Sequence, residues 1–381
     1  MTPRVWNDSR FLFEFNDRAV IDVCGVLAED PSIELIVASR DGRRAGAFAA
    51  RLAQQTARTV DWIACDALSA GFGDALVAAT PRLVIHTAGP FHGQDYAVAR
   101  ACLAAGLHYI DLADSRDFVV GIGTLDHAAR ERGVLLMSGA STVPALSTAV
   151  VDDFRGEFRR LDSIDIGISP GNQTPRGPAI VATILSSCGK PFLQWRGGRW
   201  QTSHGWQSLA RKDYPPPMGR RWLASVDVPD LALFPGRYHD VRTVVFRAGL
   251  ELTVLHLGLW ALSWIARCGV VRDWSRHAAP LRAMSLWFAR LGSNVGGMHV
   301  ALAGEDRGGK PLRLTWYLTA GSGHGPQIPA TAAVVLARKL ARGTLTARGA
   351  RPCMGLFTLP EFLAELAGLD VRTTVDREPT L

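Results

Sequence analysis

The sequence predicts an α/β protein with a Rossmann-type doubly wound parallel sheet, followed by an α+β domain with a mixed sheet. The chain has 381 residues, and about 150 residues per domain suggests two domains. From residue 33 to residue 140, β-rich runs alternate with helix-length segments, which is the pattern of right-handed βαβ units. After residue 156 this alternation stops. We therefore expect a dinucleotide-binding domain over residues 1–156 and a substrate or dimerisation domain over residues 157–381.

The first domain shows five apolar runs, each followed by a segment long enough for a helix or by the second domain. Strands of this kind, separated by such helices, form a parallel sheet that is covered on both faces. We expect strands at residues 33–39, 60–66, 82–89, 108–114 and 134–140, and helices at residues 42–55, 71–79, 94–106 and 120–133.

The second domain mixes strand-like and helix-like segments. We expect a strand at residues 161–171, a short helix from Pro178 to Ser187, and an antiparallel hairpin whose arms flank residues 307–310. A helix near the C-terminus is expected to pack back on the first domain.

Residues 248–266 form an apolar segment that approaches membrane-spanning length. Glu251 and His256 lie within it, whereas a span needs about 20 predominantly apolar residues with few charges. A buried helix of the second domain and a helix lying at a membrane surface are the two main interpretations. Trp260 and Trp264, with neighbouring arginines, suit the second, so peripheral membrane contact through residues 248–266 stays open.

The composition favours a folded cytoplasmic protein that acts on small molecules. Hydrophobic residues make up 48% of the chain, and the formal net charge is +7 with dispersed arginines. This positive field suits phosphorylated cofactors or an anionic membrane, and no nucleic-acid-binding motif accompanies it. The six cysteines form no CxxC pair, as in reduced intracellular proteins, and the N-terminus lacks a secretory signal pattern. We expect a small-molecule substrate and no nucleic acid, and a homodimer stays open.

Two strand ends carry polar residues suited to a dinucleotide. Ser39 and Arg40 follow the first of the expected strands, where an NAD-binding protein usually places an acidic residue and where arginine suits the 2′-phosphate of NADP. Asp66 follows the next strand, near the expected position of the adenine. A solvated arginine and a helix-capping aspartate are the alternatives. The expected cofactor is NADP, with NAD as the other candidate.

The loop after the strand at residues 82–89 favours a ligand lying against its backbone. Thr87, Ala88, Gly89 and Pro90 are small or rigid, so a flat ligand meets little side-chain obstruction. An ordinary turn is the alternative.

The sequence resembles the saccharopine dehydrogenase-like oxidoreductases from about Val26 to Leu366. The strings AGPFHGQDYAVARACLAAGLHYIDLADSRDFV and GASTVPALSTAVVD carry the resemblance to the NADP-binding domain, and GPQIPATAAVVLARKLARG and GARPCMGLFTLPEFLAEL are similar to the C-terminal part of bacterial members. The resemblance implies a Rossmann-type domain and pyridine-nucleotide redox chemistry. It does not imply a particular substrate.

The glycine-rich phosphate turn of that family is missing. In the family's GxGxxG pattern the glycines fall on Phe15, Asp17 and Val20. Those glycines allow a tight turn, close approach to the pyrophosphate and close helix packing. A carboxylate about 4 Å from a phosphate costs about 4 kcal/mol at an effective dielectric of about 20. Either the reading frame before about Val23 differs from that of intact relatives, or the chain has lost nucleotide binding and kept the scaffold.

Four residues are candidates for binding an amine or relaying a proton. Tyr96, Tyr109, Asp111 and Asp114 lie near the expected carboxyl-end face, although each also suits a cap or a turn. No metal site, zinc spacing or serine-nucleophile motif is found in the sequence. We expect an NADP-dependent oxidoreductase acting on a C=N, C=O or C=C bond of a partly apolar substrate. A catalytically inactive scaffold or membrane-surface protein is the alternative, so enzymatic activity itself is left open.

Overall fold

The computed structural model describes residues 10–14, 18–175 and 177–379, with side chains from residue 24 onward. The described chain divides into two compact units. Unit 1 comprises residues 1–146 and 327–365, and unit 2 comprises residues 147–326 and 366–381. The structure therefore places the boundary at residue 147 and returns the chain to unit 1, instead of the single boundary expected at residue 156.

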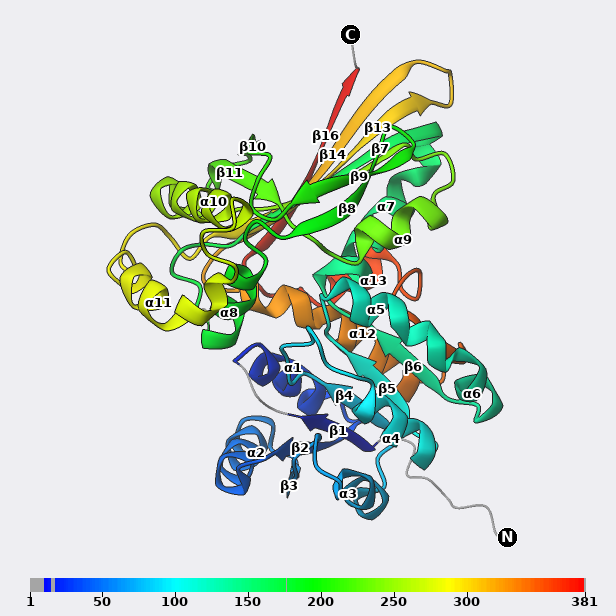
Figure 1. Ribbon diagram of the computed structural model, residues 1–381. Coiled ribbons are helices and arrows are strands. Elements are labelled where there is room, and N and C mark those ends of the chain that lie inside the picture. The colour runs from blue at the N-terminus through cyan, green and yellow to red at the C-terminus, as the bar shows by residue number, and fades with distance from the viewer. Residues whose placement is uncertain (1–9, 15–17, 176, 380–381) are drawn as a thin grey trace. The chain divides into compact units, whose positions relative to one another are not determined.

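Unit 1 is built on a parallel sheet. Its strands are β1 (Arg10–Glu14), β2 (Glu34–Ser39), β3 (Asp61–Ala64), β4 (Leu83–His86), β5 (His108–Asp111), β6 (Leu135–Ser138) and β15 (Gly349–Pro352). In the described part of the chain they lie in the order β15-β6-β5-β4-β1-β2-β3 (Figure 1), and every pairing is parallel. The order 3-2-1-4-5-6 is that of a dinucleotide-binding Rossmann sheet, so the expected fold class is confirmed.

Helices cover this sheet. They are α1 (Arg18–Glu29), α2 (Gly42–Thr56), α3 (Phe72–Ala79), α4 (Ala97–Ala105), α5 (Arg116–Gly121), α6 (Asp126–Glu131), α12 (Ile328–Ala341) and α13 (Leu359–Ala364). Helix α1 packs beside α2 and α12, and α3 packs beside α4. All four residues of β4 are buried, as are those of β5 and β6. This uninterrupted burial explains why these strands lack an alternating polar pattern.

Arg338 of α12 joins the returning segment to the start of unit 1. Its Nε lies 3.1 Å from Asp30 Oδ2, and its guanidinium also pairs with Glu365 at the end of α13. Asp30 is buried and accepts hydrogen bonds from the backbone and hydroxyl of Ser32. These ion pairs hold the C-terminal segment against the end of α1, although the two segments lie far apart in the sequence.

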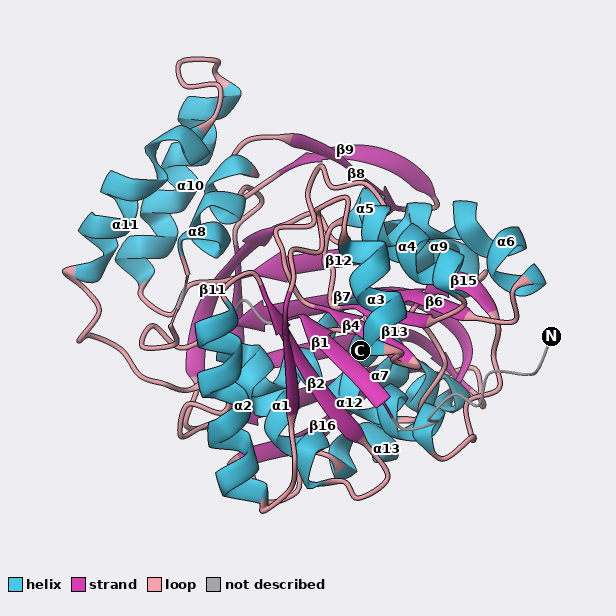
Figure 2. Ribbon diagram, turned by 90° about the horizontal axis from the view of Figure 1, so that it is seen from below, coloured by secondary structure: helices cyan, strands magenta, loops and turns pink. Residues whose placement is uncertain are grey.

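Unit 2 is an α+β domain around a mixed sheet. The sheet order is β10-β11-β12-β7-β13-β14-β16, and β8 and β9 form a separate hairpin (Figure 2). The strands are β7 (Phe158–Ser169), β8 (Pro191–Arg196), β9 (Arg199–His204), β10 (Ala210–Tyr214), β11 (Gly219–Ser225), β12 (Thr243–Ala248), β13 (Gly296–Asp306), β14 (Pro311–Ala320) and β16 (Val371–Pro379). The expected hairpin around residues 307–310 is confirmed as β13 and β14.

One face of this sheet forms the core of unit 2. Ile164, Ile166, Val300, Leu302 and Trp316 are all buried. Along β7, Ile164 and Ile166 alternate with the polar residues Ser163 and Asp165. The helices of unit 2 are α7 (Ser147–Phe154), α8 (Pro178–Ser186), α9 (Asp230–Arg237), α10 (Thr253–Arg267) and α11 (Ala278–Leu286).

The apolar segment at residues 248–266 forms the end of β12 and most of α10. The segment is a helix of the second domain, as one interpretation expected, but it is buried on one side only, at His256, Leu259 and Ser263. Among the described residues, no helix combines the length and the apolar character needed to cross a bilayer.

Candidate functional site

The carboxyl ends of the parallel strands in unit 1 form one level edge. Glu14 at the end of β1 is in register with Ala38 on β2 and with His86 on β4, and His86 is in register with Asp111 on β5. The strand order reverses between β1 and β4. Dinucleotides bind in the crevice at such a switch point, so the loops that follow these four strands define the candidate site.

The loop after β4 opens at the switch point. Thr87 and Ala88 are half-buried, and Gly89 and Pro90 are exposed and joined by a cis peptide bond. The side-chain amide of Gln94 donates hydrogen bonds to the carbonyl oxygens of Ala88 (3.1 Å) and Pro90 (2.7 Å). The loop therefore presents small residues to solvent, and the side chain of Gln94 fixes its backbone.

The loop after β2 presents arginine in place of a carboxylate. Ser39 is buried and Arg40 is exposed. Asp41 caps α2, because its Oδ1 accepts hydrogen bonds from the backbone N–H groups of Arg43 (3.0 Å) and Arg44 (3.2 Å). The carboxylate of Asp41, the acidic residue nearest the end of β2, is therefore occupied by the N-terminus of α2. The exposed arginines near that N-terminus are Arg40, Arg43 and Arg44. This arrangement suits an anion.

Asp66 shapes the loop after β3. Its Oδ1 accepts a hydrogen bond from the backbone N–H of Leu68 (3.1 Å). The following helix, α3, begins at Phe72 with Gly71 at its N-cap, so Asp66 forms a local turn and does not cap α3. Asp66 is half-buried. It lies at the same edge of the sheet, because the N–H of the preceding residue, Cys65, bonds to the carbonyl of Ser39 at the end of β2.

The two candidate tyrosines point into packed regions of unit 1. The hydroxyl of Tyr96 donates a hydrogen bond to the carbonyl of Phe118 (2.6 Å), and burial raises its pKa. Tyr109 is fully buried, and its hydroxyl lies 3.1 Å from Nδ1 of His86. Burial lowers the pKa of His86 to about 4, so this imidazole is neutral at pH 7. Both tyrosines hold the sheet and α5 in place.

Asp111 ties the ends of β5 and β6 together. Its Oδ1 accepts hydrogen bonds from the N–H of Ala113 (3.0 Å), the hydroxyl of Ser138 (2.9 Å) and the N–H of Gly139 (2.8 Å). The side chain is fully buried. Burial raises the pKa of Asp111 to about 6, against the opposing effect of these hydrogen bonds. Asp111 therefore holds the loop after β5 against the end of β6, which is a positioning role.

Asp114 differs from the other three candidates because its side chain is accessible to solvent. Desolvation by the surrounding protein raises the pKa of Asp114, and the nearby imidazole of His92 opposes that rise. His92 is exposed on the loop after β4. A carboxyl group and an imidazole thus lie at the ends of adjacent strands, where both can exchange protons with a ligand.

The expected phosphate turn lies between β1 and α1. Phe15 and Asp17 lie outside the described residues, and Val20 falls within α1. The positions of β1 and α1 are those of the first βα unit of a Rossmann fold. The prediction that the phosphate turn lacks its glycines falls on this connection, outside the described residues apart from Val20, and it stays a prediction.

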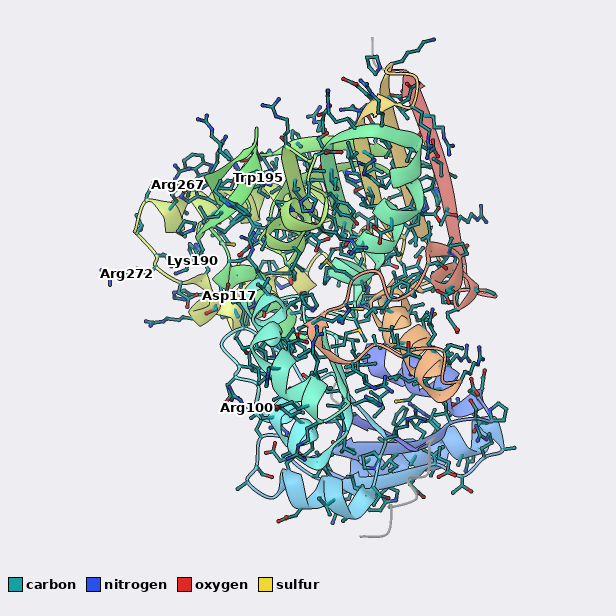
Figure 3. The ribbon with its side chains drawn as sticks, turned by 90° about the vertical axis from the view of Figure 1, so that its right-hand side faces the viewer. Arg100, Asp117, Lys190, Trp195, Arg267 and Arg272 are labelled. Carbon is teal, nitrogen blue, oxygen red and sulfur yellow. The ribbon has the colours of Figure 1, made fainter. Side chains whose placement is uncertain are left out.

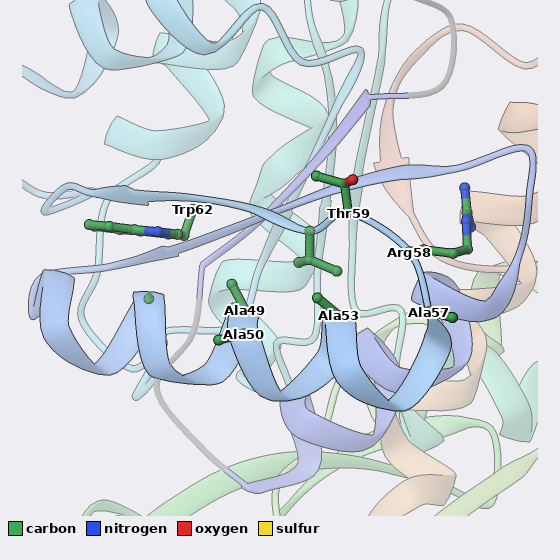
Figure 4. Close-up of a pocket in the computed structure, with 9 residues that line it drawn as sticks. Ala49, Ala50, Ala53, Ala57, Arg58, Thr59 and Trp62 are labelled. Atoms are coloured by element: carbon green, nitrogen blue, oxygen red, sulfur yellow. The ribbon is translucent and has the colours of Figure 1, made fainter.

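A surface hollow of about 510 Å³ lies elsewhere on unit 1 (Figure 4). It runs beside the edge strand β3 and is lined by Gly46, Ala49, Ala50, Ala53, Ala57, Arg58, Thr59, Val60 and Trp62. Arg58 donates hydrogen bonds to the carbonyls of Ala28 (2.9 Å) and Ile33 (3.1 Å). No acid, histidine or cysteine lines the hollow, so it offers no proton-transfer chemistry.

The structure adds residues that the sequence reasoning did not select. Arg43 and Arg44 lie in the first turn of α2, and His92 and Gln94 lie on the loop after β4. Each follows a predicted strand end within a few positions. Cys353 follows β15, and its N–H bonds to the carbonyl of Ser138. No signal predicted that a strand from residue 349 would join β6.

Comparison with known proteins supports this description. Residues 21–139 match the family model of the saccharopine dehydrogenase NADP binding domain. The match begins three residues into α1 and therefore does not include residues 15–17. No curated relative matches the chain.

A solved structure with a TM-score above 0.5 shares the fold. Saccharopine dehydrogenase (L-Glu forming) from Saccharomyces cerevisiae aligns over 97% of this chain and 100% of its own, with a TM-score of 0.68 and 13% identity. The amine dehydrogenase from Mycobacterium smegmatis aligns over 91% and 95%, with a TM-score of 0.47 and 12% identity. At these identities, the yeast structure establishes a common fold only.

Proposed function

We propose, from the match of residues 21–139 to the saccharopine dehydrogenase NADP binding domain, that the protein is an NADP(H)-dependent oxidoreductase. The observation that carries the proposal is at the end of β2. Arg40 is exposed there, and the carboxylate of Asp41 is held by α2. An arginine at this position accommodates a 2′-phosphate, whereas a free carboxylate would bind the ribose hydroxyls of NAD.

Three arginines supply the charge for the 2′-phosphate. Arg40 precedes α2, and Arg43 and Arg44 lie in its first turn. Their guanidinium groups can donate paired hydrogen bonds to phosphate oxygens. Asp66 would lie beside the adenine, and the backbone of residues 87–90 would face the middle of the cofactor.

The reaction we propose is hydride transfer to or from a C=N, C=O or C=C bond. NADPH, when bound, supplies two electrons and one hydrogen to the substrate carbon. The chain must then deliver one proton to the substrate nitrogen, oxygen or second carbon. Asp114 and His92 are the accessible groups for this transfer, and Asp111 orients the loop that carries Asp114 through its bonds to Ala113 and Gly139.

The sequence at residues 15–17 favours an alternative function. Phe15-Asn16-Asp17 contains no glycine and includes an acidic residue, where the family pattern expects a glycine-rich phosphate turn. The alternative is a catalytically inactive protein that retains the scaffold, and the missing glycines are consistent with it. The proposed experiment is therefore designed to separate loss of the phosphate turn from loss of the whole site.

The test is titration of the purified protein with NADPH and NADH, followed by fluorescence. We expect saturable NADPH binding, and Arg40→Ser should weaken it about tenfold or more, because a charge-assisted bond to phosphate contributes about 1.5–3 kcal/mol. NADH binding should be unchanged by the same variant. Arg51→Ser is the matched control, since Arg51 is exposed farther along α2.

A version with glycines at positions 15, 17 and 20 completes the design. Binding by this version alone would favour the inactive scaffold, with only the phosphate turn lost. Absence of binding by both versions up to about 1 mM would refute the proposal. Where NADPH turnover with a C=N, C=O or C=C substrate is found, Asp114→Asn should remove it while NADPH affinity changes less than about twofold.

A further inference from the structure

Exposed apolar side chains are concentrated in one segment of unit 2. Of the sixteen large apolar side chains exposed in the described chain, nine lie between residues 254 and 291. That segment is about a tenth of the protein. We call these nine residues the α10–α11 surface: Val254, Leu257, Trp264, Ile265, Val270, Met284, Leu286, Trp287 and Leu291. Exposed apolar clusters of this kind mark interaction sites.

Helix α10 is apolar on its outer side as well as on its inner side. Inward, Leu259 is buried and Leu262 packs against the apolar cluster of unit 2. Outward, Trp264 and Ile265 are 41% and 37% exposed. A surface helix of a globular domain normally exposes a polar side. The apolar outer side of α10 therefore indicates an apolar partner.

Helix α11 and the chain after it extend the same property. No residue of α11 is buried. Trp287 is 80% exposed, and Met284, Leu286 and Leu291 are each more than half exposed. Helices α8, α10 and α11 lie together in unit 2 (Figure 2). They share a small apolar cluster through Leu185 and Leu259, which leaves their outer sides for another surface.

The charges around the α10–α11 surface are almost all positive. Residues 252–291 contain five arginines, Arg267, Arg272, Arg276, Arg282 and Arg290, and a single acidic residue, Asp273. Asp273 is engaged, because its carboxylate accepts a hydrogen bond from the N–H of Ser275 (2.9 Å). Figure 3 shows Arg267, Arg272 and Lys190 at one end of unit 2.

We propose that the α10–α11 surface docks on an anionic lipid bilayer. Apolar and tryptophan side chains would enter the interface between headgroups and acyl chains, while the arginine stems lie along it with their charges among the headgroups. Each arginine near an anionic leaflet is expected to raise the partition coefficient about fivefold. Pairing of this surface with a second copy would bring five arginines against five, so the charge favours a lipid partner.

The proposed contact is peripheral. Helix α10 has 15 residues, which is shorter than the roughly 20 apolar residues that cross a bilayer. The surface lies wholly within unit 2, so the inference does not depend on cofactor binding by unit 1.

The test is flotation of the full chain with lipid vesicles. Vesicles of phosphatidylcholine alone are compared with vesicles that also contain phosphatidylserine, at low and physiological salt. We expect binding to the anionic vesicles that weakens with salt, because exposed charges are screened over about 8–10 Å at physiological ionic strength. The double variant Trp264→Ser/Trp287→Ser should reduce the partition coefficient at least about tenfold.

Two further variants make the test specific. Arg272→Gln/Arg276→Gln should reduce binding to anionic vesicles and leave weak binding to neutral vesicles unchanged. Trp62→Ser is the matched control, since Trp62 is 49% exposed but belongs to unit 1, and it should bind as the original chain does. Circular dichroism verifies that each variant is folded.

Three outcomes would overturn the proposal. The first is absence of binding to anionic vesicles at low salt. The second is equal loss of binding in the Trp62→Ser control, which would indicate adhesion by any exposed tryptophan. The third is a dimer of the original chain that the Trp264→Ser/Trp287→Ser variant converts to a monomer without any vesicle binding, which would assign the surface to self-association.

Discussion

The buried carboxyl group of Asp111 predicts an unusual dependence of stability on pH. Its pKa is raised from an ordinary value of 3.8 to about 6. Between these pH values the folded protein binds more protons at this site than the unfolded chain, so the contribution of Asp111 to stability falls as pH rises. At about 1.4 kcal/mol per pKa unit, the loss is about 3 kcal/mol and is complete slightly above pH 6.

The substitution that tests this is Asp111→Asn. Asparagine keeps an oxygen that can accept the bonds from Ala113, Ser138 and Gly139, and it has no charge to bury. The free energy of unfolding of the variant minus that of the original chain should therefore increase by about 2.4 kcal/mol from about pH 4 to about pH 7. The difference cancels the contributions of His86 and His108, whose lowered pKa values act in the opposite direction over the same range.

Hydrogen exchange of amides in β5 and β6 is the assay, because it reports the opening of unit 1 separately from unit 2. Asp117→Asn is the matched control, since it makes the same substitution at an exposed carboxyl group on α5 (Figure 3). A difference for Asp111→Asn that stays constant or decreases with pH would refute the assignment of burial as the cause.

Three other substitutions test the packing that supports the site. Gln94→Ala should cost about 1–2 kcal/mol, because it removes two hydrogen bonds to the loop after β4, and amides 87–93 should exchange faster. Arg338→Met should lower the urea midpoint by an amount equivalent to about 2–3 kcal/mol at pH 7, since it removes the nearer of the two guanidinium groups that pair with the buried carboxylate of Asp30 and leaves only Arg342 at 3.6 Å. Although burial opposes it, bonds from Ser32 and the Arg338 charge lower the Asp30 pKa, so this effect should shrink as pH falls below about 4. Gly139→Ala should cost about 2 kcal/mol or more, because its φ is +81° and an added Cβ would lie 2.7 Å from Cδ of Pro144; a thermal midpoint equal to that of the original chain would contradict the prediction.

The site residues divide by whether their neighbours are local in the sequence. The loop after β4 and the arginine after β2 were predicted because each follows a recognisable strand, and the register of a parallel sheet brings such ends together. Tyrosine and aspartate are also common catalytic residues, so the sequence could not separate a structural role from a catalytic one at Tyr96, Tyr109 and Asp111. Only the folded structure shows that these side chains bond to Phe118, His86 and Gly139, respectively. Asp114 was distinguished from them by solvent exposure, which depends on elements far away in the chain.

The proposed lipid surface shows the same limit. The apolar run and its tryptophans were visible in the sequence, and both a buried and an interfacial helix were consistent with them. Which side of α10 packs against unit 2 depends on the partners supplied by α8 and the sheet. The structure buries His256 and Ser263 and exposes Trp264, a choice that hydrophobicity along the segment does not specify.

The sequence by itself determined the Rossmann-type sheet of unit 1 and the mixed sheet of unit 2, because hydrophobic periodicity and strand–helix alternation are local patterns. It also determined that residues 15–17 contain no glycine where a phosphate turn is expected. Only the tertiary structure decided that residues 327–365 return to unit 1 and add β15 beside β6. That contact joins segments about 200 residues apart, and the buried ion pairs of Arg338 and the edge of β6 that define it exist only once the chain has folded.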